Sequence, residues 1–508
     1  MITNGKKPYI LVAIIALLHL LITFFTDQRV FLVPVTDNLP DYILCKVLAY
    51  AVLYAFYYGL FLLFFDKTAK GEAFRELLKC AMPYLVVIIV IAAFKLRDGY
   101  ISNDETLIYQ NAVTLEHYIW FTYLTTYFYI VALMLIPHVY GPIFLKLILE
   151  FLVVGYVVYR VRGYLGRYYG CATYLLFLLY PVLAYTTSAH RLPIYFFVYL
   201  YLMTVLLFDQ LEKKTAGPGK IVFLVFLAAV LTQWRTEGIY LAVLSVILLL
   251  FAYPSLRQTK NLILLIIGSL LCQYLISVPQ NGFTASELSA KADDRMKPFY
   301  AYTVTNMFRN GLDREKNRED LEVIDRYLSL DVIDAINDYY GDINYEDSLI
   351  LYADGFVGVR EEASVADFFD YADACKRLFK NNPQVLLKTR FGAFCYAALP
   401  YHISFTGSSP GELASFGVSV VKTVSYNLFI PVCFILLLCI YALIRRRFYT
   451  FFLTGGLLCH FLIVFVLAPA SYFKYYYPVY IMAYFYMLLI ILQLVYNKKY
   501  AEKISFII

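Results

Sequence analysis

The chain has 508 residues, of which 61% are hydrophobic and 16% are charged. A soluble domain is nearer half apolar and a quarter charged, so this composition excludes an ordinary soluble enzyme. The net charge of +6 comes from short Lys and Arg clusters between apolar runs, which is the pattern of the positive-inside rule and not of nucleic-acid binding. We therefore expect an all-α, polytopic membrane protein.

Apolar runs long enough to cross a bilayer recur along most of the chain. The first follows Lys6 and Lys7 and is not succeeded by a small-residue cleavage site, so we expect a retained helix and not a signal peptide. With it, the sequence predicts twelve membrane-spanning helices: 9–25, 42–65, 80–96, 143–159, 171–187, 193–208, 219–234, 238–253, 261–278, 424–444, 449–468 and 477–496.

A further apolar stretch, residues 119–136, is not expected to span. If it spanned, every basic cluster from Arg160 onward would move to the side opposite the earlier clusters. The positive-inside rule favours the arrangement that keeps the clusters together, with both termini in the cytoplasm. Residues 97–142 then form an extracytoplasmic loop, in which 119–136 lies in the interface or re-enters the membrane under a cover of protein.

The predicted organisation has four parts. Residues 1–79 hold two N-terminal helices, and residues 80–278 form a transmembrane core that includes the outer loop. Residues 279–411 are the longest polar stretch, with helical patterning in DREKNREDLEVIDRYLSLDVIDAINDYYGD, and are expected to form a mostly helical extracytoplasmic insert. Residues 412–508 hold the C-terminal transmembrane helices.

The adjacent carboxylates Asp104 and Glu105 follow the third predicted helix, in the stretch RDGYISNDETLIYQN. A carboxylate that is partly desolvated at a membrane edge can act as a general base toward an acceptor hydroxyl. The alternative is structural, because SNDET is rich in N-cap residues and an amphipathic helix can begin there.

Basic residues occupy three other predicted outer turns. Arg235, in LTQWRTEGIY, can bind a phosphate with its planar guanidinium, or pair locally with Glu237. His190 and Arg191, in YTTSAHRLPIYFF, are candidates for the same anion, unless Arg191 only snorkels to headgroups. Lys474, in APASYFKYYYPVY, can bind phosphate as a point charge or anchor a helix end.

The sequence gives no indication of a metal or another cofactor. No His, Cys or carboxylate group has zinc spacing, and no DxD motif stands beside Asp104. The nine cysteines lie mostly inside apolar runs, where they read as small hydrophobic residues. The motif GxSxG is absent, which argues against an α/β-hydrolase.

Several of these stretches resemble the polytopic GT-C glycosyltransferases, such as the protein O-mannosyltransferases and the aminoarabinose transferase of lipid A. SNDETLIYQNAV is similar to the family's DE…Y motif in the first outer loop, and the region after it resembles that loop's two juxtamembrane helices. LTQWRTEGIYLAV resembles the family's helix start of a basic residue followed by glycine. FKYYYPVYIM resembles its RY..P entry into a late helix, with Lys474 in place of Arg. The likeness covers residues 80–278 and, loosely, the C-terminal part.

The resemblance implies a GT-C-like core and a sugar donor carried on polyprenyl phosphate. Asp104 would deprotonate the acceptor for an inverting displacement, and Glu105 would support it. Arg235, Arg191, His190 and Lys474 would bind the donor phosphate, where charge builds in the transition state. The acceptor would be an envelope glycan or protein, reached on the outer face of what we expect to be a bacterial plasma membrane.

Two other classes stay open. A flippase or transporter of lipid-linked glycans would show inverted repeats and charges near the middle of its helices, and the sequence leads us to expect neither. A polysaccharide polymerase or O-antigen ligase would depend on arginines in a large outer loop, and the predicted insert holds Arg295, Arg309, Arg314, Arg318, Arg326, Arg360 and Arg390.

Overall fold

The computed structural model describes residues 7–95, 103–116, 121–186, 191–340, 358–400 and 410–500. Within these ranges the chain is helical, with no strand and one isolated bridge between Leu328 and Val359. The chain divides into two compact units. The first comprises Met1–Ser277, Arg446–Phe452 and Tyr484–Ile508, and the second comprises Val278–Arg445 and Leu453–Ala483.

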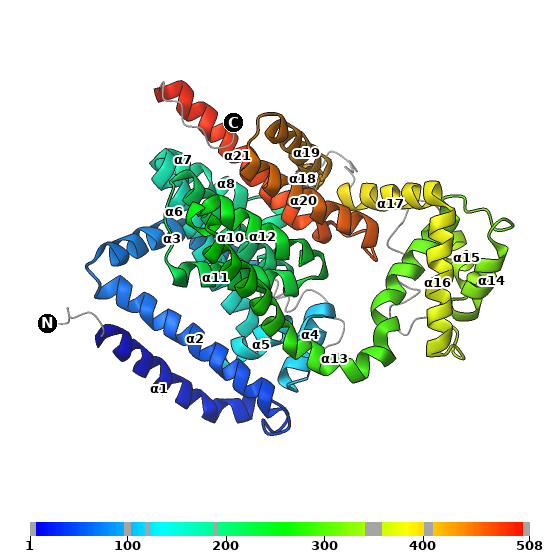
Figure 1. Ribbon diagram of the computed structural model, residues 1–508, viewed down its shortest axis with the longest axis horizontal. Coiled ribbons are helices and arrows are strands. Elements are labelled where there is room, and N and C mark those ends of the chain that lie inside the picture. The colour runs from blue at the N-terminus through cyan, green and yellow to red at the C-terminus, as the bar shows by residue number, and fades with distance from the viewer. Residues whose placement is uncertain are drawn as a thin grey trace. The chain divides into compact units, whose positions relative to one another are not determined.

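Besides the segments Arg446–Phe452 and Tyr484–Ile508, the first unit holds helices that run from blue to green in Figure 1, where α1 and α2 lie side by side as a hairpin. In chain order they are α1 (Lys7–Val30), α2 (Leu39–Phe64), α3 (Ala69–Lys95), α4 (Asn103–Val113), α5 (Tyr123–Leu135), α6 (Gly141–Leu165), α7 (Arg167–Ala172), α8 (Tyr174–Phe177), α9 (Tyr180–Tyr185), α10 (Arg191–Leu211), α11 (Pro218–Trp234), the 3₁₀ helix η2 (Thr236–Tyr240), α12 (Leu241–Ala252), η3 (Pro254–Arg257) and the start of α13 (Thr259–Arg309).

Nine helices in the described part of the chain are long and apolar enough to cross a membrane, which confirms a polytopic membrane protein. Each coincides with one of the twelve predicted spans. The other three predicted spans differ: 219–234 and 238–253 correspond to helices below that length, and 171–187 is divided into α7, α8 and α9. Pro181 stands in the first turn of α9, where its missing N–H and its ring exclude the continuation of a preceding helix.

Helix α5 lies in the stretch that was not expected to span. It has 13 residues and is therefore about 20 Å long, whereas the hydrocarbon core is about 30 Å thick. The flanking helices α3 and α6 pack antiparallel, with Glu76 paired to Arg162 at 3.4 Å and Tyr84 beside Glu150. In this register the start of α6 lies at the same end of the helix pair as the end of α3. The two helices approach closely at Gly155, where an added Cβ would lie 2.6 Å from the Cβ of Ala81.

Polar contacts define the two ends of the first unit. At one end Asp209 is fully buried and accepts from Arg160 at 3.3 Å, from Lys220 and from Tyr253. The predicted cytoplasmic loops after α6, α10 and α12 are thereby joined. At the other end the backbone N–H of Leu32 in the α1–α2 turn donates to the carbonyl of Val113 at the end of α4. At each end of the unit, the loops that these contacts bring together are loops that the sequence analysis assigned to the same side of the membrane.

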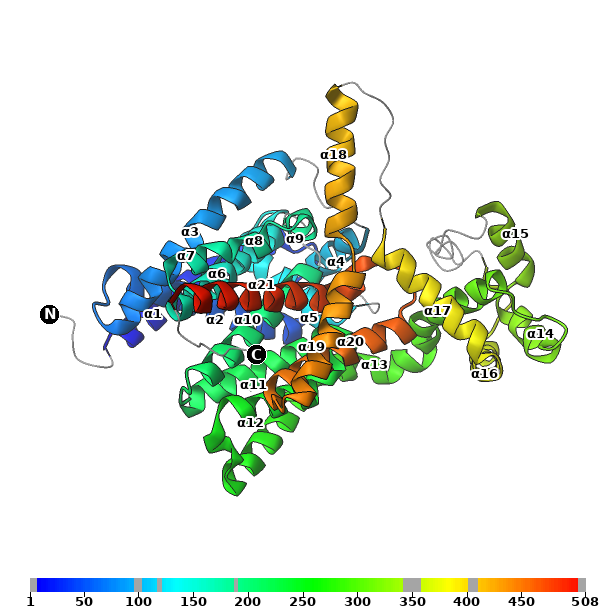
Figure 2. The same cartoon turned by 90° about the horizontal axis from the view of Figure 1, so that it is seen from above.

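The second unit contains the predicted insert together with C-terminal helices. Its elements are the remainder of α13, α14 (Arg318–Tyr327), α15 (Leu330–Tyr340), α16 (Val365–Asn381), α17 (Pro383–Ala398), α18 (Pro410–Ser425), α19 (Phe429–Ile444), most of α20 (Phe448–Leu467), η5 (Phe473–Tyr476) and the start of α21 (Tyr477–Tyr500). Figure 2 shows α14, α15 and α16 grouped around the C-terminal part of α13.

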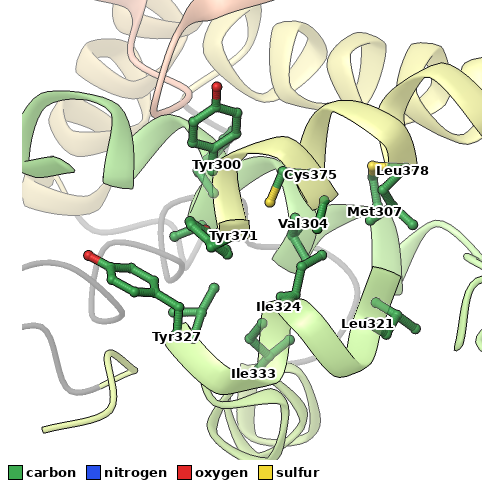
Figure 3. Packing of buried hydrophobic residues seen from close by; sticks show 14 of the residues in the cluster. Tyr300, Val304, Met307, Leu321, Ile324, Tyr327, Ile333, Tyr371, Cys375 and Leu378 are labelled. Atoms are coloured by element: carbon green, nitrogen blue, oxygen red, sulfur yellow. The ribbon is translucent and has the colours of Figure 1, made fainter. Parts of the chain in front are cut away.

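A buried apolar cluster holds these four helices together (Figure 3). Tyr371 and Cys375 of α16 are fully buried against Tyr300 of α13 and Tyr327 of α14, and the Tyr327 and Tyr371 rings stack at 4.8 Å. Burial raises the pKa of the Cys375 thiol well above its usual value, so this cysteine is packed as a hydrophobic residue. The amphipathic pattern of the predicted insert thus corresponds to a helical core.

Candidate functional site

The acidic pair lies in the first turn of the short helix α4. Asp104 is half-buried and Glu105 is fully buried. A helix does begin here, at Asn103, and the positive end of its dipole favours carboxylates in this turn. The dipole alone does not account for the burial of Glu105, because a carboxylate taken out of water needs hydrogen bonds or an opposite charge.

An opposite charge comes from Lys146 on α6, which attracts Glu105 electrostatically. The Lys146 ammonium is itself fully buried and forms an ion pair with Glu150, one turn further along the same helix, at 3.0 Å. It also donates to the backbone carbonyls of Tyr185, at 2.8 Å, and Thr186, at the end of α9. One cation therefore lies among two buried carboxylates and the end of a neighbouring helix.

Sequence reasoning missed this cluster. Lys146 and Glu150 lie inside a predicted span, GPIFLKLILEFLVV, where two charges read as interruptions of an apolar run. Their i, i+4 spacing was the available signal, because it places both side chains on one face of a helix. Charged residues inside a transmembrane segment are costly and are retained mainly where they pair or serve a function.

The second group of site residues surrounds Trp234, at the end of α11. The indole Nε1 donates to the carbonyl of Arg191, the first residue of α10, at 3.0 Å. The guanidinium of Arg191 lies 4.0 Å from the centre of the Phe121 ring, and Thr122 donates to the carbonyl of Trp234 at 3.3 Å. The outer loop and the beginning of α10 therefore meet at Trp234, immediately before Arg235.

Arg235 forms the local ion pair that was one of its two predicted roles. Its Nε and one terminal nitrogen donate to the two oxygens of Glu237, at 3.1 and 2.5 Å. The arginine side chain is 3% exposed and that of Glu237 is 15% exposed. Gly238 follows, where a Cβ would lie 2.5 Å from the carbonyl of Leu231, so the close return of the chain requires glycine. A bidentate pair of this kind holds a guanidinium in one orientation.

The remaining two candidates do not enter this group. His190 lies outside the described residues. Lys474 belongs to the second unit, where it sits on η5 with its ammonium 4.7 Å from the ring centre of Tyr472. The turn that carries it is held on both sides, by a hydrogen bond between Ser471 and Tyr302 and by one from His460 to the carbonyl of Tyr475 at 2.9 Å.

Lys146 pairs with Glu150 and donates to the end of α9. Its contact with the carbonyl of Thr186 lies shortly before Arg191 in the chain, and Arg191 contacts Trp234 beside Arg235. The site thus offers carboxylates that can accept a proton and guanidinium groups that can neutralise an anion. Within the ranges that the structure describes, no group of three His, Cys, Asp or Glu residues could hold a metal ion.

Comparison of the chain with protein-family models, with curated proteins and with solved structures finds no match. The fold and the site therefore define a class, a polytopic helical membrane protein with a charged cluster among the ends of its core helices.

Proposed function

We propose that this protein is a membrane glycosyltransferase that moves a sugar from a polyprenyl-phosphate donor to an acceptor on the extracytoplasmic face. The observations that support the proposal are the acidic pair in the first turn of α4, with Glu105 fully buried and Asp104 half-buried, and the group at Trp234 that brings Arg191 beside Arg235. Such a donor has a lipid tail suited to the membrane, a phosphate suited to arginine and a sugar that reacts beside the acid.

The reaction requires a base and a stabilised leaving group. In the proposed mechanism Asp104, which is half-buried, takes the proton of the acceptor hydroxyl, and the acceptor oxygen displaces the phosphate at the anomeric carbon with inversion. Glu105 orients the acceptor. Arg191 and Arg235 offset the charge that develops on the departing phosphate, and such fixed cations act most strongly where water is excluded. No protein-bound cofactor takes part in these steps.

A transporter or flippase of lipid-linked glycans is the second candidate, and one observation favours it. The Lys146–Glu150 pair is buried well inside α6, and a second buried pair joins Lys46 of α2 to Asp27 of α1. Charges buried within spans are a feature of transport pathways. The ligase alternative gains less support, because Arg314 and Arg360 of the predicted insert are engaged in ion pairs with Asp334 and Asp325.

Substitution of Asp104 tests the proposal. Membranes containing the protein are supplied with radiolabelled sugars on polyprenyl phosphate, and transfer to endogenous acceptor is measured. Asp104→Asn should reduce transfer by a factor on the order of 100 or more, since a general base contributes roughly that much. The matched control is Asp37→Asn, an exposed acidic residue in the α1–α2 turn, which should transfer at the wild-type rate. Undiminished transfer by Asp104→Asn would remove that residue from the mechanism.

Topology is tested separately by chemical labelling. A single cysteine replaces Tyr140, at the start of α6, in a chain whose native cysteines are substituted. A membrane-impermeant maleimide should label it from outside intact cells, because the α3–α6 register returns the chain to the outer end. The control cysteine replaces Lys213, beyond α10 at the other end, and should react only after permeabilisation. Labelling of position 140 from the cytoplasm alone would place the site on the wrong face.

A further inference from the structure

We propose that α17 is an interfacial helix, which lies in the leaflet where α20 ends and anchors the predicted insert to the bilayer. The sequence predicts residues 279–411, which include this helix, to be extracytoplasmic as a whole. With 16 residues α17 is about 24 Å long, so it does not reach across a hydrocarbon core of about 30 Å. The proposed contact is with lipid, so it does not depend on glycosyl transfer.

One face of α17 packs against two helices of the membrane part. The ring of Phe394 lies 5.3 Å from that of Phe429, the first residue of α19, and 5.2 Å from that of Phe461 in α20. The backbone N–H of Leu428 donates to the carbonyl of Ala398, at the end of α17, at 3.2 Å. Both α19 and α20 lie in segments that are long and apolar enough to cross a membrane. The packed face of α17 is therefore joined to spanning helices.

The place of these contacts along α20 gives their depth. α20 has 20 residues and is about 30 Å long, which matches the thickness of the hydrocarbon core. Phe461 precedes Leu467, the last residue of α20, by six positions, so it lies about 9 Å from that end. Arg390, one turn before Phe394 in α17, donates to the carbonyl of Ala468 just past the end, at 2.7 Å. An interfacial helix lies at a similar depth of roughly 5–10 Å.

The exposed face of α17 carries an apolar row. Leu387 and Phe391 are 61% and 55% exposed, and they are four residues apart, which places them on one face of the helix. Cys395 and Leu399 continue the row at the same interval. Since the opposite face is packed, α17 is apolar on both sides, which is typical of a helix surrounded by protein or lipid and not of one in contact with water.

The charge of α17 suits a phospholipid surface. The helix contains no acidic residue, and its exposed cation is Lys388, which stands beside the apolar row. The stem of a lysine can cover apolar surface while its ammonium reaches the headgroup phosphates. Beside the contact of Phe394, the spanning helices also expose apolar side chains, Ile430 on α19 and Leu462 on α20. The row thus continues an apolar surface that lipid already covers, so we assign it to lipid and not to a second protein.

Two other helices of the insert have polar exposed faces. In α16 the exposed Phe369 is followed by Asp370, also exposed, and by the exposed ion pair of Asp373 with Lys376 at 2.8 Å. In α14 the exposed side chains include the ion pair of Arg318 with Glu322, also at 2.8 Å. These charged faces are typical of helices in contact with water. The apolar row therefore distinguishes α17 from these neighbours in the insert.

The connection between α16 and α17 transmits the anchor to the insert. Asn382 lies between the two helices, and its side chain exchanges hydrogen bonds of 2.7 and 3.4 Å with that of Asn317, just before α14. Both asparagines are buried. Lipid contact along α17 would therefore hold the helical core of the insert at the bilayer surface.

Fluorescence quenching in nanodiscs that hold one copy of the protein tests the lipid contact. Trp120 and Trp234 are replaced by phenylalanine in the full-length chain, and Phe391→Trp places a single fluorophore in the row. The matched control is Phe369→Trp, because the two phenylalanines are 55% and 52% exposed. Each variant is measured in phosphatidylcholine with and without bromine on the upper part of the acyl chains, and then with iodide added to the water.

The two variants should respond to opposite quenchers. Emission of Phe391→Trp should fall by about twofold or more in the brominated lipid, because an interfacial helix reaches the acyl boundary, and iodide should change it little. Phe369→Trp should be quenched by iodide and not by the brominated lipid. Quenching of Phe391→Trp by iodide alone would place the row in water and overturn the proposal. Protection of Phe391→Trp from both quenchers would also overturn it, since protein would then cover the row.

Lipid labelling of the unmodified protein decides the question if the tryptophan-free parent elutes as aggregate. Wild-type protein in nanodiscs containing a phospholipid with a diazirine on its acyl chain is irradiated, digested and analysed by mass spectrometry. Lipid adducts should occur on the part of α17 that contains Leu387 and Phe391, and not on the part of α16 that contains Phe369. Adducts on α19 and α20 without any on α17 would contradict the proposal.

Discussion

Replacing Glu237 with glutamine separates the two roles considered for Arg235. Arg235 forms a bidentate ion pair with Glu237, and a phosphate bound by the same guanidinium would compete with that carboxylate. Arg235→Met removes the cation, while Glu237→Gln keeps the cation and weakens its competitor. If Arg235 binds the donor phosphate, the two substitutions should change the KM for the donor in opposite directions.

The size of the effect follows from the geometry of the pair. Arg235 is nearly completely buried, so its hydrogen bonds to a charged group are each worth about 1.5–3 kcal/mol. Since 1.4 kcal/mol is a factor of ten in affinity, Arg235→Met should raise the donor KM by roughly 10- to 100-fold. Glu237→Gln should lower it by a few-fold, because a neutral amide still accepts one hydrogen bond but no longer neutralises the guanidinium.

The assay is sugar transfer at varied polyprenyl-phosphate donor concentration, with the thermal unfolding midpoint of each variant measured in the same detergent. Loss of the ion pair should lower the midpoint in both variants, so stability alone cannot produce opposite changes in KM. A rise in donor KM of similar size in both variants would refute phosphate binding and leave Arg235 with a local structural role.

Three further predictions concern stability. Asp209→Asn should lower the free energy of unfolding by about 3 kcal/mol because the buried guanidinium of Arg160 loses this carboxylate, whereas Glu212→Gln, at a partly exposed position, should cost less than about 1 kcal/mol. Arg390→Met should cost about 1–3 kcal/mol by leaving the partly buried carbonyl of Ala468 without its donor, and the exposed Arg377→Met less than about 1 kcal/mol, both measured by chemical unfolding. Ser364→Ala removes the capping box of α16 and should speed amide hydrogen exchange in its first turn about fivefold; unchanged exchange would contradict the cap.

The membrane class and the short, non-spanning helix α5 could be predicted from the sequence. Apolar run length is a direct physical requirement of the bilayer, so α1, α2 and α6 follow from composition. The placement of α5 followed from charge asymmetry, which compares the loops on either side of each span and needs no knowledge of packing.

Elements that depend on local backbone chemistry or on distant partners were harder to predict. The division of 171–187 into three helices depends on Pro181 and on the packing around it, which a hydropathy average does not detect. The contacts of Lys146 join α6 to the end of α9, and nothing in the local pattern of α6 indicates which helix ends will be nearby. The Arg235–Glu237 pair was one of the two roles predicted for Arg235, because both partners are close in sequence.

Part of the charge distribution was also misjudged. All candidate residues were sought at helix ends, because charges there are less costly than inside a span. Glu150 lies within α6 and is fully buried, so the expectation that charges avoid the middle of the helices was incomplete. The ion pair with Lys146 resolves the apparent cost, since each charge is neutralised at 3.0 Å.

Photo-crosslinking of the donor tests the central claim most directly. A polyprenyl-phosphate sugar with a photoreactive group on the first isoprene unit is bound to the purified protein, irradiated and located by mass spectrometry. We predict adducts on α4 and at Arg191 and Trp234, competed away by unlabelled polyprenyl phosphate. Adducts confined to other helices, such as the α1–α2 hairpin, or adducts that the competitor does not reduce, would contradict a donor site in this cluster.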